Sequence, residues 1–241
     1  MEYEAGDAAE SGLSSDRRVV GLKRRLVREA MIAVSMLESA VQALWTLDTD
    51  AATAVRLTDD RVDNEEVEIE QECYAILALY HPFAREFRII TFVLKVNADI
   101  ERVADHASSI AKVASKISKL NCPTPVWPTS LVELSQRVPA MCHELLRAVL
   151  DEDTDAARRL VVSDETIDQL DRRLFEETTD MLKRDRSDAG VMVAMYIYRV
   201  GRELERIGDL MANIAEDVVY LTTGEIIRHA KRRPRTPKAP G

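Results

Sequence analysis

Apolar residues recur along most of this chain at alternating spacings of four and three positions. The pattern is clearest over residues 193–221, and it returns over 89–117. In each segment it lasts for about four heptads, which is typical of a long helix packed in a bundle. Together with the distribution of proline and glycine, the apolar pattern predicts six helices, at about 16–47, 51–80, 84–119, 130–150, 154–184 and 188–222.

Helix-breaking and capping residues set the expected ends of these helices. Pro82 should end the second helix, because proline disfavours the helical conformation in the residue before it. Ser130 and Glu133 have the spacing of a capping box at the start of the fourth helix. Gly224 should end the sixth. Three prolines in NCPTPVWP, residues 121–128, predict a linker between the third helix and the fourth.

The chain also aligns with itself when it is shifted by 104 residues. ADIERVADHASSIAK (98–112) then falls on RELERIGDLMANIAE (202–216), and with a shift of 105 DDRVDNEEVEIE falls on DETIDQLDRRLF. A duplication of this length indicates two copies of one structural unit. We therefore predict an all-α fold of two tandem, pseudo-symmetric three-helix bundles whose long helices run up and down.

The expected organisation has five parts. A disordered N-terminal extension precedes the first repeat, a proline-rich linker joins the two repeats, and a basic, disordered tail ends the chain. The boundaries of these parts are 1–15, 16–120, 121–128, 129–224 and 225–241.

Charge and composition narrow the classes of partner. The net charge is −9, and the last eleven residues carry five basic side chains and no acidic one, so the remainder is more acidic still. We therefore expect no binding to nucleic acid. Three cysteines without close spacing are typical of a reduced, cytoplasmic protein. The apolar run at 191–198 is too short to span a bilayer, so we expect membrane contact only through partners.

Acidic residues form a second pattern, on the side of the sixth helix away from its apolar stripe. Glu205, Asp209 and Glu216 share this face. Like charges at such spacings destabilise a helix by roughly 0.2–0.5 kcal/mol per pair, so their repetition needs a reason. Small residues lie between the acidic face and the apolar stripe, at Gly201, Gly208, Ala212 and Ala215.

These small residues should let a neighbouring helix approach closely, with the acids along the edge of the contact. If the neighbour carries Asp164, Asp168 and Asp171, two acidic edges meet. Carboxylate ligands suit Mg²⁺, Ca²⁺ or Mn²⁺, and bridging carboxylates also suit iron. The alternative is an ordinary solvated helix face. His106 is interpreted as a surface histidine, because Leu210 replaces it in the second copy.

The paired motifs resemble those of the PhoU family of phosphate-signalling regulators. The resemblance extends over about residues 17–229 and is carried by DIERVADHA, ELERIGDLMANIAEDVVYLTTGE, DDRVDNEEVE, DETIDQLD and HPFAREFRII. It implies a cytoplasmic protein that is often a homodimer. The motifs offer no nucleophile or general base, so we expect no enzymatic activity. The resemblance also implies negative regulation of the phosphate-starvation response and control of high-affinity phosphate uptake. The implied partners are the sensor histidine kinase of the phosphate regulon and the ATPase of the phosphate ABC transporter.

The resemblance also implies multinuclear metal clusters, of iron or of zinc, manganese or magnesium, on paired acidic motifs. The implied ligands are Asp164, Asp168, Glu205 and Asp209 in the second repeat and Asp59, Asp63, Glu101 and Asp105 in the first, with Asp171, Glu216 and Glu66 as further ligands. In the first copy, Ser109 and Lys112 replace Asn213 and Glu216. Because Lys112 is positively charged, we expect the second set to bind metal better than the first.

Two other functions compete with the regulator. A carboxylate-bridged metalloenzyme is opposed by the absence of the Glu-x-x-His ligand pair of di-iron bundle enzymes. The sequence also lacks a glycine-rich phosphate loop and a G-x-S-x-G motif. A structural helical-repeat or scaffold protein of the spectrin type is opposed by the linker at 121–128, because such repeats are joined by continuous helix.

Overall fold

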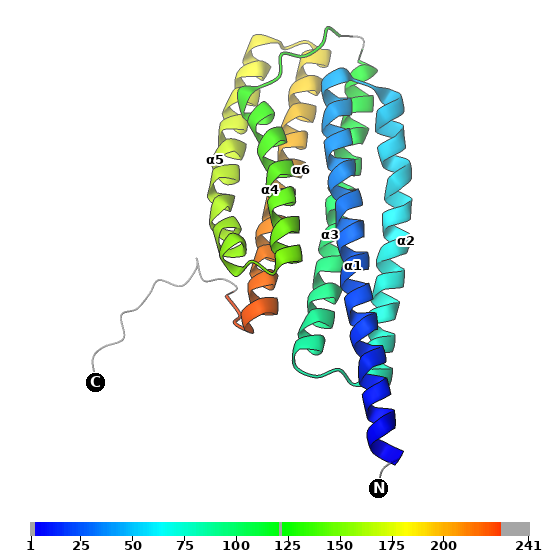
Figure 1. Ribbon diagram of the computed structural model, residues 1–241. Coiled ribbons are helices and arrows are strands. Elements are labelled where there is room, and N and C mark those ends of the chain that lie inside the picture. Colours follow the sequence, from blue (N-terminus) through cyan, green and yellow to red (C-terminus); the bar gives the residue numbers. More distant parts are fainter. Residues whose placement is uncertain (1–2, 121, 228–241) are drawn as a thin grey trace, which may run out of the picture.

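The structure is a computed structural model (Figure 1). It describes the backbone of residues 3–120 and 122–227 and the side chains of 17–120, 122–163 and 165–227. This part of the chain forms six helices and no strand. The helices are α1 (Tyr3–Thr46), α2 (Thr49–Tyr80), α3 (Arg85–Ser118), α4 (Thr129–Asp151), α5 (Thr154–Arg184) and α6 (Asp188–Thr223).

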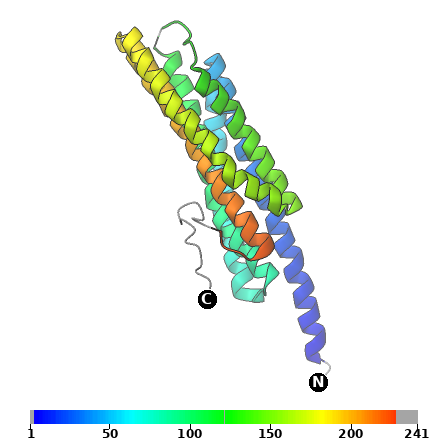
Figure 2. The same ribbon diagram turned by 90° about the vertical axis from the view of Figure 1, so that its left-hand side faces the viewer.

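The six helices form two bundles that lie side by side. Helices α1, α2 and α3 pack against one another, as do α4, α5 and α6. All six run roughly along one axis, which makes the molecule elongated (Figures 1 and 2). The prediction of an all-α fold with two tandem three-helix bundles is confirmed.

Equivalent caps begin the second helix of each bundle. The carboxylate of Asp48 accepts hydrogen bonds from the backbone N–H groups of Asp50 and Ala51 at the start of α2. The carboxylate of Asp153 caps α5 in the same way. Aspartate at this position satisfies N–H groups that have no partner within the helix. The two repeats therefore share their helix-starting chemistry as well as their apolar pattern.

The predicted helix ends at Pro82 and Gly224 are confirmed. Helix α2 stops at Tyr80, and His81 adopts the left-handed conformation with φ of 47°. Helix α6 ends at Gly224, whose φ of 75° is readily adopted by glycine alone.

The predicted capping box of α4 is wrong. Pro128 is the N-cap residue and makes no side-chain cap, while Glu133 pairs with Arg137 one turn further along the helix. The N–H of Ser130 instead donates to Oε2 of Glu177 on α5, at 3.1 Å. A carboxylate from another helix thus does what the local sequence pattern was expected to do.

The two ends of the chain differ from expectation in different ways. Helix α1 begins at Tyr3, within the segment 1–15 that was expected to be disordered, so the structure differs from that expectation. The physical reason is that this segment contains alanine and glutamate, which favour helix, and no proline. Of the expected basic tail, only 225–227 are described, and they are not helical; 228–241 lie outside the described residues.

The linker crosses the upper end of the molecule in Figure 1. Residues 122–128 are not helical, and Trp127 packs edge to face on Trp45 of α1, with ring centroids 5.0 Å apart and planes at 74°. This contact ties the linker to the first bundle. No helix in the described part of the chain has both the length and the apolar character that a membrane crossing requires.

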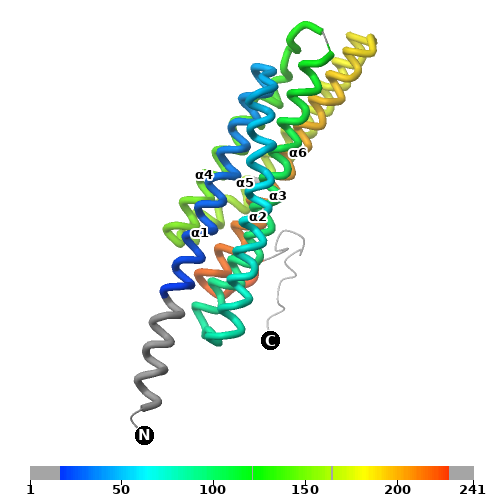
Figure 3. The backbone as a smooth tube through the Cα atoms, turned by 90° about the vertical axis from the view of Figure 1, so that its right-hand side faces the viewer, coloured from blue at the N-terminus to red at the C-terminus, as the bar shows by residue number. Residues whose placement is uncertain are grey.

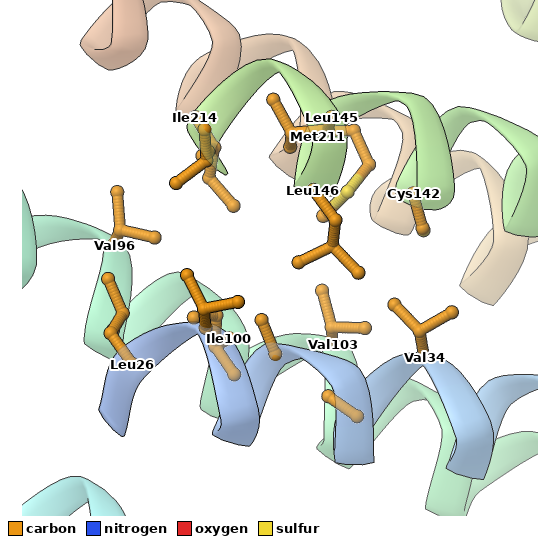
Figure 4. Close-up of a pocket in the computed structure, with 14 residues that line it drawn as sticks. Leu26, Val34, Val96, Ile100, Val103, Cys142, Leu145, Leu146, Met211 and Ile214 are labelled. Carbon is orange, nitrogen blue, oxygen red and sulfur yellow. The ribbon is translucent and has the colours of Figure 1, made fainter. Parts of the chain in front are cut away.

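The surface between the two bundles, which we call the seam, is formed by α3 against α6 and by α1 against α4. Helices α3 and α6 run in opposite directions, as the tube in Figure 3 and the ribbon in Figure 1 show. The middle of the seam is apolar and contains a cavity of about 40 Å³ between α1, α3, α4 and α6 (Figure 4).

Polar contacts also cross the seam. Lys95 Nζ lies 3.3 Å from the carboxylate of Asp217 and 5.2 Å from the ring centre of Tyr220. His106 Nδ1 lies 2.8 Å from Oε2 of Glu203. The interpretation of His106 as a surface histidine is wrong, because only 14 % of its side chain is exposed. The duplication within one chain did not reveal how the two copies face each other.

Candidate metal centre

Helices α5 and α6 approach each other closely at two glycines. A Cβ atom on Gly208 would lie 3.1 Å from Cγ2 of Ile167, and one on Gly201 would overlap the side chain of Leu174. Both neighbours belong to α5. The expectation that small residues of the sixth helix form a close helix contact is therefore confirmed.

This contact brings acidic residues of the two helices together along its edge. One carboxylate oxygen each from Asp168, Glu205 and Asp209 lies within 4.8 Å of the other two. Asp168 and Glu205 are half-buried, and Asp209 is exposed. Oxygen ligands on opposite sides of a Ca²⁺-sized ion, each bound at about 2.4 Å, lie about 4.8 Å apart. Among the side chains described, this is the one such group of three, and we call it the acidic triad.

Arg202 lies beside the acidic triad. Its Nη1 is 3.0 Å from Oδ2 of Asp171 and 3.2 Å from Oε1 of Glu205. The second oxygen of each of these carboxylates, Asp171 Oδ1 and Glu205 Oε2, is buried and makes no hydrogen bond in the described structure. A buried acceptor without a partner is costly, and a cation would satisfy it. The donor set therefore fits a hard cation.

Electrostatics at the triad point the same way. Burial raises the pKa of Glu205, Arg202 opposes this effect, and Asp209, Asp171 and Asp168 raise the pKa further. A pKa above the ordinary value means that the surroundings disfavour the ionised carboxylate. A bound cation would instead favour the ionised form of the Glu205 carboxylate.

The remaining predicted residues of the second repeat lie around the triad. Asp171 is held by Arg202 rather than included in the group of three. Glu216 is half-buried on α6 and is also not one of the three. Asp164 belongs to α5, but its side chain lies outside the described residues.

The acids of the first repeat also lie near one another, but their arrangement differs from that of the acidic triad. Burial raises the pKa of Glu101 to about 7, and Asp105, Glu66, Asp63 and Asp59 each add to the rise. These five acids are thus close enough to interact. In the described part of the chain, however, no three of them place ligand atoms as close together as the acidic triad does.

Lys112 distinguishes the charge around the acids of the first repeat from that of the second, where Glu216 takes its place. Burial raises the pKa of Asp59, and Lys112 acts in the opposite direction. The lysine therefore places positive charge near the acids of the first repeat, as its position in the sequence led us to expect. The geometry supports the preference for the second set, while metal binding by either set remains a proposal.

Sequence reasoning missed Glu203 altogether. Its side chain is 9 % exposed, and Arg199 Nε lies 3.4 Å from its Oε1 in addition to the contact with His106. Its position in the sequence could have indicated burial, because Glu203 lies one helical turn from Val200 and from Ile207, which belong to the apolar stripe. A carboxylate on that side needs a partner, but the sequence does not say which.

Comparison with known proteins gives a consistent result. The model of the PhoU domain matches residues 26–114 and 131–218, once in each bundle. The phosphate-specific transport system accessory protein PhoU homolog of Deinococcus radiodurans is 33 % identical over 78 % of this chain and 87 % of its own. The phosphate-specific transport system accessory protein PhoU of Escherichia coli is 32 % identical over 80 % of this chain and 78 % of its own. The crystal structure of PhoU from Pseudomonas aeruginosa superimposes with a TM-score of 0.82 at 29 % identity, covering 87 % of this chain and 99 % of that one.

Proposed function

This chain belongs to the PhoU family, and we propose that it is an accessory protein of a phosphate-specific transport system that limits phosphate uptake and represses the phosphate-starvation response when phosphate is plentiful. The observation that carries this proposal is the match of one PhoU domain to each bundle. The names of the relatives from Deinococcus radiodurans and Escherichia coli support the link to phosphate transport.

The proposed action is through protein contact. The partners we propose are the ATPase of the phosphate ABC transporter and the sensor histidine kinase of the phosphate regulon. Since both present domains to the cytoplasm, this chain would act there, as a homodimer. Long rigid helices with little intervening loop suit a protein that presents surfaces to partners.

The acidic triad is the proposed metal site of this regulator. Asp168, Glu205 and Asp209 would hold a divalent cation or an iron cluster, with Asp171 and Arg202 beside them. Bound metal would neutralise the repelling carboxylates and fix α5 against α6. We propose no catalytic role, since the triad contains no histidine and the relatives are named as accessory proteins.

Deletion of the gene tests the regulatory proposal. In a host strain that lacks every PhoU family gene, we expect high expression from a phosphate-responsive promoter and rapid uptake of radioactive phosphate in phosphate-rich medium. Expression of this chain should lower both. The proposal fails if promoter activity and uptake are the same with and without the chain. An unrelated helical protein, expressed at the same level, is the control.

A further inference from the structure

An open cavity of about 330 Å³ lies where the first bundle meets the turn between α4 and α5. Helix α1 contributes Lys23 and Arg24 to its wall, and Arg85 comes from the start of α3. Glu86 follows on α3, Leu150 comes from the end of α4, and Glu152 comes from the α4–α5 turn. We call this cavity the basic groove. Because both repeats line it, anything bound there would contact both.

The basic groove is lined by three cations and two carboxylates, Glu86 and Glu152, so its charge is slightly positive and opposite in sign to that of the chain as a whole. Residues 17–28 of α1 carry six basic side chains and no acidic one, in a protein of net charge −9. Arg25 is already surrounded by acids, because it pairs with Glu65, Glu68 and Glu72 of α2. Arg18 lies over the ring of Tyr80 and Lys23 pairs with Glu152, so Arg24 is the exposed cation that α1 offers at the groove.

Ion pairs inside the basic groove hold some of its cations without neutralising all of them. Glu152 accepts hydrogen bonds from Lys23 Nζ at 2.8 Å and from Arg85 Nη2 at 3.1 Å. Arg85 is nevertheless 69 % exposed. Arg24 is exposed, and no described acid lies within ion-pair distance of it. A carboxylate from outside could therefore bind Arg24 and share Arg85 with Glu152.

The basic groove also has apolar walls. Val20 and Leu150 line it and are 46 % and 57 % exposed, and buried apolar residues lie deeper between them. Just before Arg85 in the chain, Phe83 is 82 % exposed. Exposed apolar surface next to uncompensated charge is typical of a surface that binds a partner.

The turn that carries Arg85 has an unfavourable backbone conformation. His81 and Ala84 both have positive φ, at 47° and 44°, although neither is a glycine. Such conformations persist where the surrounding structure enforces them, and they concentrate at functional sites. Here they place Arg85 at the rim of the basic groove.

We infer that the basic groove docks a short acidic segment of a partner protein, with a bulky apolar side chain in the cavity and carboxylates on Arg24 and Arg85. Charge complementarity selects an acidic segment. The concave shape suits a protruding side chain better than it suits a flat bilayer. The inference rests on the proposed function, because the segment would belong to a component of phosphate transport or sensing.

The first test uses a defined probe and the full chain. A fluorescein-labelled peptide of sequence Glu-Asp-Leu-Phe-Asp-Glu is titrated with the protein and followed by fluorescence anisotropy. The double variant Arg24→Glu/Arg85→Glu should weaken binding by about ten-fold or more, because charge reversal places like charges opposite each other. A peptide with Ser-Ser in place of Leu-Phe should also bind about ten-fold more weakly, since it cannot fill the cavity.

A matched variant controls for the change in net charge. Arg56→Glu/Arg137→Glu makes the same charge change at two exposed positions that do not line the basic groove. The inference is overturned if this control weakens binding as much as Arg24→Glu/Arg85→Glu does, or if both peptides bind equally. It is also overturned if the peptide does not bind while vesicles of phosphatidylcholine and phosphatidylglycerol bind in a manner that depends on Arg24 and Arg85.

A second test separates this inference from the proposed function. The transporter ATPase and the cytoplasmic part of the sensor kinase from the same organism are each tested for binding to the same variants. Binding that is insensitive to Arg24→Glu/Arg85→Glu would overturn the inference and leave the proposed function intact. If the peptide binds the basic groove but neither protein binds the chain, the proposed partners are wrong and the groove remains a docking site.

Discussion

His106 Nδ1 of α3 lies 2.8 Å from Glu203 Oε2 of α6, across the seam between the two repeats. Both side chains are largely buried, at 14 % and 9 % exposure. Burial raises the pKa of Glu203, but the hydrogen bond and charge of His106 outweigh this effect together with Arg199 and Arg206, so the pKa is lowered. The pair is therefore one of the polar contacts that hold the two bundles together.

Replacing His106 should destabilise the protein. His106→Leu introduces the residue found at the equivalent position 210 and removes the hydrogen-bond partner of Glu203, which keeps only the interactions with Arg199 and Arg206. A buried carboxylate that loses its partner costs about 1–3 kcal/mol, which urea denaturation would measure. His143→Leu is the control, because His143 makes an equally short contact with Glu38 but both groups are about half exposed. Equal losses of stability for the two variants would contradict the importance of burial.

The close contact of α5 with α6 depends on Gly208. Gly208→Leu should push Ile167 away, lower the free energy of unfolding by about 1–3 kcal/mol and weaken metal binding at the acidic triad. Gly21→Leu is the control, because nothing lies within 4 Å of a Cβ at that position. Urea denaturation and metal titration measure the two effects. A variant at Gly208 with unchanged stability and metal affinity would show that the close approach is not required.

Trp127 should protect the linker from proteolysis. Trp127→Ala removes the edge-to-face contact with Trp45, which is worth roughly 0.5–1.5 kcal/mol beyond the area that it buries. We expect faster trypsin cleavage after Lys119, which is exposed at the end of α3, just before the linker. Trp127→Phe retains an aromatic ring and should cleave at nearly the wild-type rate. Identical rates for the alanine variant and the wild type would exclude this role.

Glu101 should make the metal-free protein less stable as the pH rises. Its pKa in the folded protein is raised from 4.5 to about 7 by burial, with Asp105 and the other acids adding to the rise. The folded state therefore binds a proton more tightly than the unfolded state, and this contribution to stability is complete below pH 4.5. It is lost as the pH rises to about 7.

The variant Glu101→Gln tests this contribution. The difference in unfolding free energy between wild type and variant should change by on the order of 1 kcal/mol between pH 4.5 and 7.5, measured with a chelator present. Because Asp105, Glu66, Asp63 and Asp59 interact with Glu101, the difference reports the titration of Glu101 together with its coupling to these acids. A difference that does not vary with pH would show that Glu101 titrates as an ordinary exposed glutamate.

The helices and their duplication could be predicted because both depend on local sequence. Pro82 and Gly224 end their helices by backbone conformation alone, so their positions suffice. Gly201 and Gly208 were recognisable as a close contact because small residues share one face of α6. The meeting of acidic edges followed from the same argument.

What could not be predicted depends on how separate elements are placed against each other. The capping of Ser130 by Glu177 and the pairing of His106 with Glu203 both join residues distant in sequence. The choice of Asp168 as the α5 member of the triad also depends on how far α5 is shifted along α6. Helical periodicity shows which residues share one face of a helix, but it does not show how far α5 is shifted along α6.

The most direct test of this account is the metal content of the untagged protein, measured by elemental mass spectrometry after loading with iron, zinc or manganese. Wild type and Glu101→Gln/Asp105→Asn should retain metal, whereas Glu205→Gln/Asp209→Asn should lose most of it while circular dichroism shows unchanged helicity. Retention of metal by the Glu205→Gln/Asp209→Asn variant, or wild-type protein that binds none of the three metals, would contradict the assignment of the acidic triad as a metal site.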